Sequence, residues 1–458
     1  MFWKLRKLIV LLLLVFMING CQSGEMTGIN GSPASSSVST QIATIQEGNL
    51  SAKFLFSPVS RQSPIQLSDE RMDEFVQGRN SFGLTIFQNL RTVISDQNLV
   101  FSPYSIGLAL AMTYGGASET TAEEMRQVLE IDKNDEEFHR AWNYLTQRFD
   151  TRVKEIQSES PDYAFQITNA VWAQQGYPFL ETYLNLLSSQ YGSGIFTVDF
   201  SGFPEPARLE INEWVKNQTN QRIDSLIPKG AIKPLTRMVL VNAFYLNAAW
   251  KHPFPIELTR AEPFYLSDQN IVDVDMMTQT LNTFYRVNDK FSMVEIPYIG
   301  EDLSMLIIMP SEQSFETFIS QLDGNALTDL MNRETSGKVE LKLPRFTTSS
   351  NFELRDVLTE MGMPLAFDPA LADFSAMAQG HDLYLDQVIH QAMIDVDEAG
   401  TEAAAATASL MLGKGFDPSE PVKITLNRPF LFLIRDITSG SILFLGQITN
   451  PTRSVSTN

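Results

Sequence analysis

The order in which helical and strand-like segments follow one another restricts the fold of this chain more than any other feature. Residues 68–93 begin with an acid-rich turn and carry apolar residues at helical spacing, and a second helical segment starts on the pair Ser102-Pro103, which is typical of a helix N-terminus. β-Branched and aromatic runs bounded by turn residues come later, between residues 164 and 448. Because helices and strands do not alternate regularly, the sequence predicts an α+β domain with large, mostly antiparallel sheets.

Charge and motif content exclude several functions. The formal net charge is −20 at pH 7, whereas phosphate binding depends on clustered Lys and Arg, so we expect no nucleic-acid partner. The chain has no P-loop, no G-x-S-x-G and no H-E-x-x-H motif, and a single cysteine cannot form a zinc-binding pair. We therefore expect no catalytic residues, no metal and no cofactor.

The first 20 residues predict a signal peptide. A charged region precedes an apolar run over residues 8–18 that is too short to span a bilayer comfortably. The run stops just before Cys21, the only cysteine, in a context similar to the site at which bacterial lipoproteins are cleaved and lipidated. We expect an exported lipoprotein, anchored through Cys21 at the cell surface or in the periplasm. An ordinary secretory signal or a single N-terminal membrane anchor is the alternative. The charged region consists of Lys4, Arg6 and Lys7.

Residues 21–66 read as the lipidated cysteine followed by a flexible tether. Beyond Cys21 they are rich in Ser, Thr, Gly, Gln and Pro and show little apolar periodicity. Folded protein is predicted to begin at Leu67, so the domain would occupy residues 67–453. Such a tether would hold the domain away from a membrane surface.

The segment from Asp397 to Pro418, DEAGTEAAAATASLMLGKGFDP, is ambiguous by local pattern. Alanine has the highest helix propensity, but glycines and Pro418 bound the segment, and about twelve residues is marginal for an unsupported helix. The segment also lies between two strand-like runs, IHQAMIDV and VKITLN. Local pattern alone favours a short surface helix or a slack linker.

Seven segments resemble successive signature segments of the serpins, in family order, from about residue 68 to 452. The resemblance implies the serpin fold: three β-sheets, of which the central sheet A is large and mostly antiparallel, eight to nine helices, and an exposed reactive loop at about residues 398–421. The segments are NLVFSPYSIGLALAMTYGGASETTAEEM, VNAFYLNAAWKHPF, LSMLIIMP, LKLPRF, LTEMGMPLAFDPALADFSAM, DQVIHQAMIDVDEAGTEAAAAT and NRPFLFLIRDITSGSILFLGQITNP.

The resemblance also gives the alanine-rich segment a role. In an inhibitory serpin a protease cleaves the reactive loop, and the part before the cut inserts into sheet A as a new strand. Every second residue from Thr401 to Thr407 would face one side of that strand, and small side chains without proline suit a central position. Gly400 would supply backbone freedom where the chain folds back into the sheet. The implied hinge residues are Glu398, Gly400, Thr401, Glu402, Ala403, Ala404, Ala405, Ala406 and Thr407.

The family spacing places the scissile bond between Lys414 and Gly415. A lysine before the bond fits the acidic pocket of trypsin-like proteases. Counting back from the next strand favours Phe416, and other neighbouring bonds suit chymotrypsin-like or elastase-like enzymes. The further candidates before a cut are Leu410, Met411 and Leu412.

Two groups of supporting residues follow from the resemblance. The first is a buried polar cluster beneath the point where sheet A opens: Ser102, Ser105, Asn242 and His390. The second lies with Glu398 at the top of the sheet: Trp250, Pro344 and Phe346. Ordinary core packing is the alternative explanation for each of them.

The function implied by the resemblance is suicide inhibition by a metastable, monomeric protein. Its partners would be a target serine protease, held as a covalent acyl complex, and a membrane, reached through the lipid on Cys21. Two alternatives remain: a neighbouring bond that serves chymotrypsin-like, elastase-like or cysteine proteases, and a non-inhibitory surface lipoprotein that keeps the fold.

Overall fold

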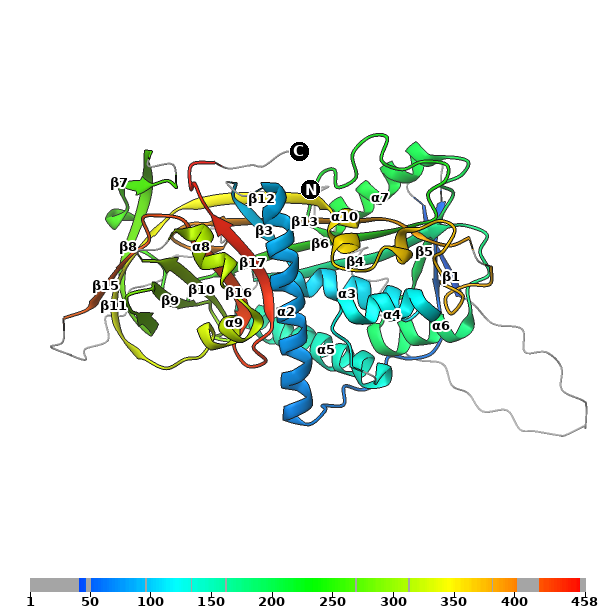
Figure 1. Cartoon of the computed structure of the whole chain (residues 1–458), viewed down its shortest axis with the longest axis horizontal. Coiled ribbons are helices and arrows are strands. Elements are labelled where there is room, and N and C mark those ends of the chain that lie inside the picture. Colours follow the sequence, from blue (N-terminus) through cyan, green and yellow to red (C-terminus); the bar gives the residue numbers. More distant parts are fainter. Residues whose placement is uncertain are drawn as a thin grey trace, which may run out of the picture. The chain divides into compact units, whose positions relative to one another are not determined.

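The computed structural model describes the chain from Gln41 to Arg453 with several gaps. The described ranges are 41–46, 51–94, 97–132, 134–160, 163–267, 270–311, 314–380, 382–401 and 420–453. They contain nine α-helices and two large hydrogen-bonded sheets, so the predicted α+β class is confirmed (Figure 1).

Most of the helices belong to the first half of the chain, as the sequence pattern predicts. The α-helices are α2 (Asp69–Ile94), α3 (Pro103–Tyr114), α4 (Glu119–Val128), α5 (Asp135–Glu159), α6 (Glu181–Leu186), α7 (Pro204–Gln218), α8 (Phe315–Ser320), α9 (Gly324–Leu330) and α10 (Arg355–Glu360). Shorter helical turns are η1 (Leu187–Tyr191), η2 (Ile256–Leu258) and η3 (Leu365–Phe367).

The central sheet has eight strands and is mostly antiparallel. Only β4 with β5 and β6 with β13 pair in parallel. In spatial order the strands are β1 (Gln41–Gln46), β2 (Ser51–Phe56), β5 (Ile195–Val198), β4 (Ala164–Gln174), β6 (Met238–Ala249), β14 (Gly400–Thr401), β13 (Leu385–Val396) and β12 (Phe346–Glu353).

The remaining strands form a second and a third sheet that share the long strand β8. One end of β8 pairs with β9, and the rest pairs with β7 and β11, so the three predicted sheets are present with two of them joined. In spatial order the strands are β15 (Val422–Thr425), β11 (Ser336–Pro344), β8 (Ile271–Val287), β9 (Phe291–Pro297), β10 (Leu303–Pro310), β16 (Phe430–Asp436), β17 (Ile442–Ile448) and β3 (Leu99–Phe101), while β7 (Arg260–Tyr265) pairs with β8.

The two faces of the central sheet bury different cores. Phe244, Leu246 and Ala248 of β6 face the large core, which includes α3, β16 and β17. Val239 and Val241 alternate with them and face a smaller core under α7. This period of two is why β6 is apolar along almost its whole length, as a strand buried on both faces must be.

Helix α3 lies directly behind the central sheet and begins as its sequence predicts. Ser102 is the N-cap, and its Oγ accepts a hydrogen bond from the Ser105 backbone N–H at 3.1 Å. Pro103 occupies the first turn, and Gly115 caps the C-terminus. All twelve residues of α3 are buried.

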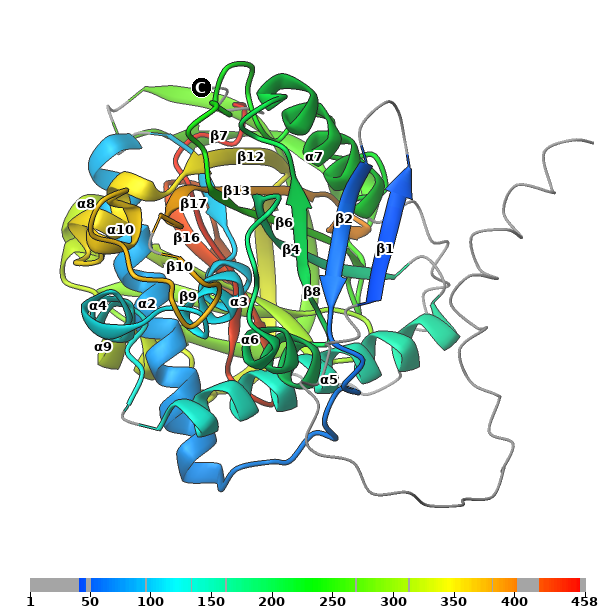
Figure 2. The same cartoon turned by 90° about the vertical axis from the view of Figure 1, so that its right-hand side faces the viewer.

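The folded part of the chain starts before residue 67, earlier than the sequence pattern indicates. Strand β2 pairs with β5 at the edge of the central sheet, and β1 pairs with β2. Figure 2 shows this hairpin next to α7, where the Ala52 N–H donates to Glu210 Oε1 at 2.6 Å. The Phe54 and Phe196 rings lie 4.6 Å apart. The tether predicted for residues 21–66 therefore ends earlier. Strand β2 was missed because polar residues flank it and because its partner, β5, is far away in the sequence.

None of the helices within the described ranges is long and apolar enough to cross a membrane. The described residues also contain no group of three or more His, Cys, Asp or Glu side chains placed to hold a metal ion.

Truncation tests the contribution of the hairpin. A protein that begins at Leu67 loses the β2–β5 pairing and the aromatic contact of Phe54, so we expect about 3–5 kcal/mol less stability than in a protein that begins at Ser39. Calorimetry at a fixed scan rate measures this as a lower melting temperature. A protein that begins at Ser51 keeps β2 and should lose less. Equal melting temperatures for the Ser39 and Leu67 proteins would contradict the assignment of β2 to the fold.

Candidate functional site

The predicted hinge lies at the seam between β6 and β13 in the central sheet. These strands pair in parallel up to Phe244 and Ala392. Further up, β14 separates them: Gly400 pairs with Ala249, and Thr401 pairs with Ala248 on one side and with Val396 on the other. The seam is therefore closed below and occupied above by the first two residues of the predicted inserting segment.

Gly400 is required by the close approach of its neighbours. A Cβ atom at this position would lie 2.3 Å from the Ala248 carbonyl oxygen and 2.7 Å from Ala249 Cα. Any larger residue would thus push the chain away from β6. Thr401 follows with 1% exposure, and its hydroxyl lies 2.7 Å from the Tyr298 hydroxyl.

Trp250 fixes the path of the chain into the seam. Its indole Nε1–H donates to the Asp397 carbonyl at 3.0 Å, and its backbone N–H donates to the Ala399 carbonyl at 2.9 Å. Its ring stacks on Tyr298 with a centroid distance of 4.5 Å. Trp250 therefore holds the hinge through two hydrogen bonds, in addition to its stacking on Tyr298.

Glu398 anchors the base of the loop through a buried carboxylate. Arg345 Nη2 lies 2.6 Å from both carboxylate oxygens, and the Thr259 hydroxyl donates to Oε1 at 2.6 Å. Burial raises the pKa of Glu398, but the hydrogen bonds from Thr259 and Arg345 outweigh burial, so the pKa is lowered overall. The carboxylate stays ionised and holds the loop to the segment between β11 and β12.

Pro344 and Phe346 position Arg345. Pro344 is the last residue of β11 and Phe346 the first of β12, so the arginine lies at the turn between the two sheets. Phe346 is 2% exposed and packs against the ring of Phe432 at 5.7 Å. Of the three residues predicted at the top of the sheet, Trp250 contacts the hinge directly, whereas Pro344 and Phe346 flank the arginine that binds Glu398.

The four residues of the predicted polar cluster lie together below the hinge and cross the seam. The Ser102 N–H donates to His390 Nε2 at 3.0 Å, and His390 Nδ1 bonds to Asn242 Oδ1, which joins β13 to β6. Asn242 Nδ2 donates to Asn169 Oδ1, and the Ser105 hydroxyl donates to the same oxygen at 2.9 Å. One chain of hydrogen bonds therefore connects α3, β13, β6 and β4.

The donor and acceptor roles in this chain of hydrogen bonds require a neutral His390. Because Nε2 accepts from a backbone N–H, the ring proton must be on Nδ1, where it is donated to Asn242. In an imidazolium, Nε2 would also carry a proton, and this N–H would point at the Ser102 backbone N–H, which is itself a donor. Burial lowers the pKa of His390 to about 3, which is consistent with this neutral form.

Two residues of the site were missed by sequence reasoning. Asn169 interrupts the apolar run ITNAVWAQ, and a polar residue in the middle of a buried strand is a signal for a hydrogen-bonded cluster. Arg345 lies inside LPRF, but nothing local in the sequence pairs it with Glu398. Conversely, many of the predicted residues lie outside the described residues: Cys21, Glu402, Ala403, Ala404, Ala405, Ala406, Thr407, Leu410, Met411, Leu412, Lys414, Gly415 and Phe416.

His390 should make stability depend on pH. Its folded-state pKa lies below the unfolded value of about 6.5, so the unfolded chain binds the proton first as the pH falls. The contribution is complete above pH 6.5 and is lost between pH 6.5 and 3. From pH 6.5 to 5 we expect the wild type to lose about 2 kcal/mol more than His390→Gln in denaturant unfolding. His252→Gln, which changes an exposed histidine, should behave like the wild type. Equal pH slopes for the wild type and His390→Gln would contradict the neutral network.

Comparisons with known proteins agree with this geometry. Residues 77–451 match the family profile described as Serpin (serine protease inhibitor). An uncharacterized serpin-like protein of Thermococcus kodakarensis is 36% identical over 97% of this chain and 98% of its own length, and antithrombin-III of Mus musculus is 32% identical over 86% and 85%. The crystal structure of the thermophilic serpin tengpin in its native state superposes with a TM-score of 0.74 at 26% identity, covering 86% of this chain and 97% of tengpin. The predicted fold is confirmed, and the chain belongs to the serpin family.

Proposed function

We propose that this protein inhibits serine proteases as a suicide substrate whose reactive loop inserts into the central sheet. The observation that supports the proposal most directly is the position of β14 in the central sheet. Gly400 and Thr401 lie between β6 and β13 and pair with both strands, which is where an inserting strand must begin. Serpins typically target proteases, and this chain carries the family fold over nearly its whole described length.

The register of β14 indicates where each inserting residue would arrive. Thr401 is opposite Ala248 and Val396, so an antiparallel continuation brings Thr407 opposite Asn242 and His390. Thr407 would face the same side as these two residues because side chains alternate with a period of two. Its hydroxyl can donate to Asn242 and accept from His390. Insertion would thus break the bond between them and supply a replacement to each partner.

Insertion would also replace a weaker pairing by two stronger ones. The β6–β13 seam is parallel, and parallel ladders are slightly less stable per residue than antiparallel ladders. A strand inserted in the β14 direction pairs antiparallel on both sides. With about ten further residues, the gain in backbone hydrogen bonds is on the order of 10 kcal/mol. This difference would drive the trapping step.

The chemistry proposed for the protease begins as ordinary peptide cleavage. Its serine oxygen attacks the carbonyl carbon of Lys414, the bond to Gly415 breaks, and the leaving nitrogen takes a proton from the protease's general acid. An ester then joins the serine to Lys414. Insertion of the preceding residues carries the attached protease along the sheet and distorts its site before water can hydrolyse the ester.

Lys414 predicts a trypsin-like target. The neighbouring bonds after Leu410, Met411, Leu412 or Phe416 are the alternatives, and they would serve chymotrypsin-like, elastase-like or cysteine proteases instead. The inhibitor itself uses no cofactor in this scheme and acts as a monomer.

Incubation with proteases tests the proposal. The protein from Ser39 onward is mixed separately with trypsin, chymotrypsin and elastase, and the products are separated on denaturing gels. With trypsin we expect a stable band at the summed mass of both proteins and a released C-terminal peptide that begins at Gly415, because the ester survives denaturation. The peptide's first residue identifies the scissile bond directly.

Two variants separate trapping from simple cleavage. Thr401→Arg introduces a charged side chain at a position that is 1% exposed, and Thr407→Val leaves Asn242 and His390 without a hydroxyl after insertion. Both should be cleaved while forming much less complex. Thr151→Arg, at an exposed site on α5, is the control. Loop cleavage by the wild type with no stable band and no loss of protease activity would instead support a non-inhibitory serpin.

We further propose that Cys21 carries a lipid that anchors the exported protein to a membrane. The signal-like segment before Cys21 supports this assignment. In a bacterial host, the full-length protein should incorporate radiolabelled palmitate and partition into detergent, whereas Cys21→Ser should do neither. Labelling that persists in Cys21→Ser would contradict lipidation at this residue.

A further inference from the structure

A cavity of about 170 Å³ lies between the N-terminal half of α2, the loop after α4 and the start of α5. None of its lining residues belongs to the hinge or to the polar cluster below it. At about 30 Å³ for each water-sized group, the cavity accommodates roughly six non-hydrogen atoms. Its apolar lining consists of Leu67, Phe75, Ile131, Phe138 and Ala141.

Arg79, on α2, lines this cavity with a guanidinium that is buried without an acceptor. The residue is 7% exposed, and its Nε and Nη1 atoms find no hydrogen-bond partner within the described part of the chain. The guanidinium carbon lies 5.4 Å from the centre of the Phe75 ring and 5.1 Å from that of Phe138. The two rings hold the guanidinium in place, but they offer no oxygen to accept its N–H groups.

The carboxylates that line the cavity are bound to other partners. Glu130 accepts a hydrogen bond from the Ser81 hydroxyl at 2.8 Å. Arg71 forms ion pairs with the three other carboxylates, all of them partly exposed at the mouth of the cavity: Glu74, Asp132 and Glu137. Four carboxylates thus stand against one arginine at the mouth, which makes the mouth negative while Arg79 keeps the interior positive.

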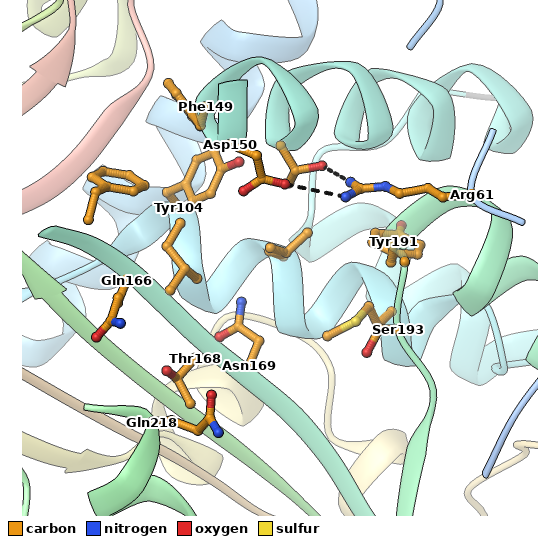
Figure 3. A pocket seen from close by; sticks show the side chains of 16 residues that line it. Arg61, Tyr104, Phe149, Asp150, Gln166, Thr168, Asn169, Tyr191, Ser193 and Gln218 are labelled. Carbon is orange, nitrogen blue, oxygen red and sulfur yellow. Dashed lines mark hydrogen bonds and ion pairs between the residues drawn. The ribbon is translucent and has the colours of Figure 1, made fainter. Parts of the chain in front are cut away.

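A buried cation in a folded protein normally has an anionic partner, because burying an unpaired charge is costly. Arg61, which lines a different cavity, follows this rule: it forms an ion pair with Asp150 at 3.5 Å (Figure 3). Burial lowers the pKa of Arg79 to about 10, and attraction to Glu130 offsets only part of this effect. The side chain therefore stays charged at neutral pH. A charged, unpaired donor beside a cavity indicates a missing anion.

We propose that this cavity binds a short ω-amino acid. The ligand's carboxylate would accept hydrogen bonds from Arg79, its methylene groups would lie against Phe75 and Phe138, and its ammonium would lie among the carboxylates at the mouth. With roughly six non-hydrogen atoms inside and the ammonium nitrogen at the mouth, the size corresponds to 4-aminobutyrate. A polyanion is disfavoured because the carboxylates at the mouth would repel it.

Calorimetric titration with 4-aminobutyrate tests the proposal. The chain from residue 21 is used with Cys21→Ser, so that no lipid is attached. We expect one ligand per chain with a Kd below about 1 mM. Butyrate, which lacks the ammonium, should bind at least about fivefold more weakly. Butylamine, which lacks the carboxylate and would face the guanidinium, should not bind measurably at about 1 mM.

Arg79→Met removes the charge and keeps apolar contact with the two aromatic rings. The change should weaken binding of 4-aminobutyrate at least about tenfold. The melting temperature without ligand should stay equal or rise, because an unpaired buried charge is removed. Arg428→Met, the same substitution at an exposed arginine elsewhere, should leave binding unchanged.

Glu137→Gln tests the orientation of the ligand. With one negative charge fewer at the mouth, 4-aminobutyrate should bind about threefold more weakly, whereas butyrate should bind equally or more tightly. Weaker binding of both ligands would contradict this orientation. The same 4-aminobutyrate affinity in the wild type and Arg79→Met, equal affinities of the wild type for 4-aminobutyrate and butyrate, or no binding of 4-aminobutyrate at about 1 mM would overturn the proposal.

Discussion

The structure depends on a parallel seam in the middle of an otherwise largely antiparallel sheet. β6 and β13 are held together along the lower part of this seam by backbone pairing and, at one level, by the bond between His390 and Asn242. Parallel pairing in a sheet of this kind leaves a position that an antiparallel strand fits better. The polar cluster, the glycine at position 400 and the anchored carboxylate of Glu398 all lie along the line where such a strand would run.

The two ends of the seam are stabilised by different physics. At the top, Glu398 is ionised and is held by Arg345 and Thr259, so charge fixes the start of the loop. Lower down, His390 must be neutral, because its ring accepts from a backbone N–H on one side and donates to an amide on the other. A charged anchor tolerates small shifts, whereas a directed hydrogen-bond chain does not. The base of the loop is thus fixed by an ion pair. Separation of β6 and β13 would break the hydrogen bond between His390 and Asn242.

Local pattern predicted the elements well and the connections between them poorly. The helix that starts at Ser102 and Pro103 carries its own capping signal, and β6 carries the apolar run of a doubly buried strand, so both follow from short-range rules. The arrangement of the three sheets came from the resemblance of ordered segments, not from periodicity. Pairings across large sequence separations have no local signal: β2 with β5, and Arg345 with Glu398.

At Gly400 the structure shows a constraint that sequence reasoning did not find. Sequence reasoning assigned it to backbone freedom at a fold-back. The structure adds a steric cause, because the position of a Cβ atom is already occupied by the backbone of β6.

The N-terminal hairpin changes what the central sheet presents at its edge. Without it, β5 would be the outermost strand, with four buried apolar or small residues, Ile195–Val198, and neither a charge nor a proline to discourage pairing. Such an edge is a template for strands of other molecules. β2 occupies it and places the exposed side chain of Lys53 beside it. The hairpin therefore prevents the strands of other molecules from pairing with β5.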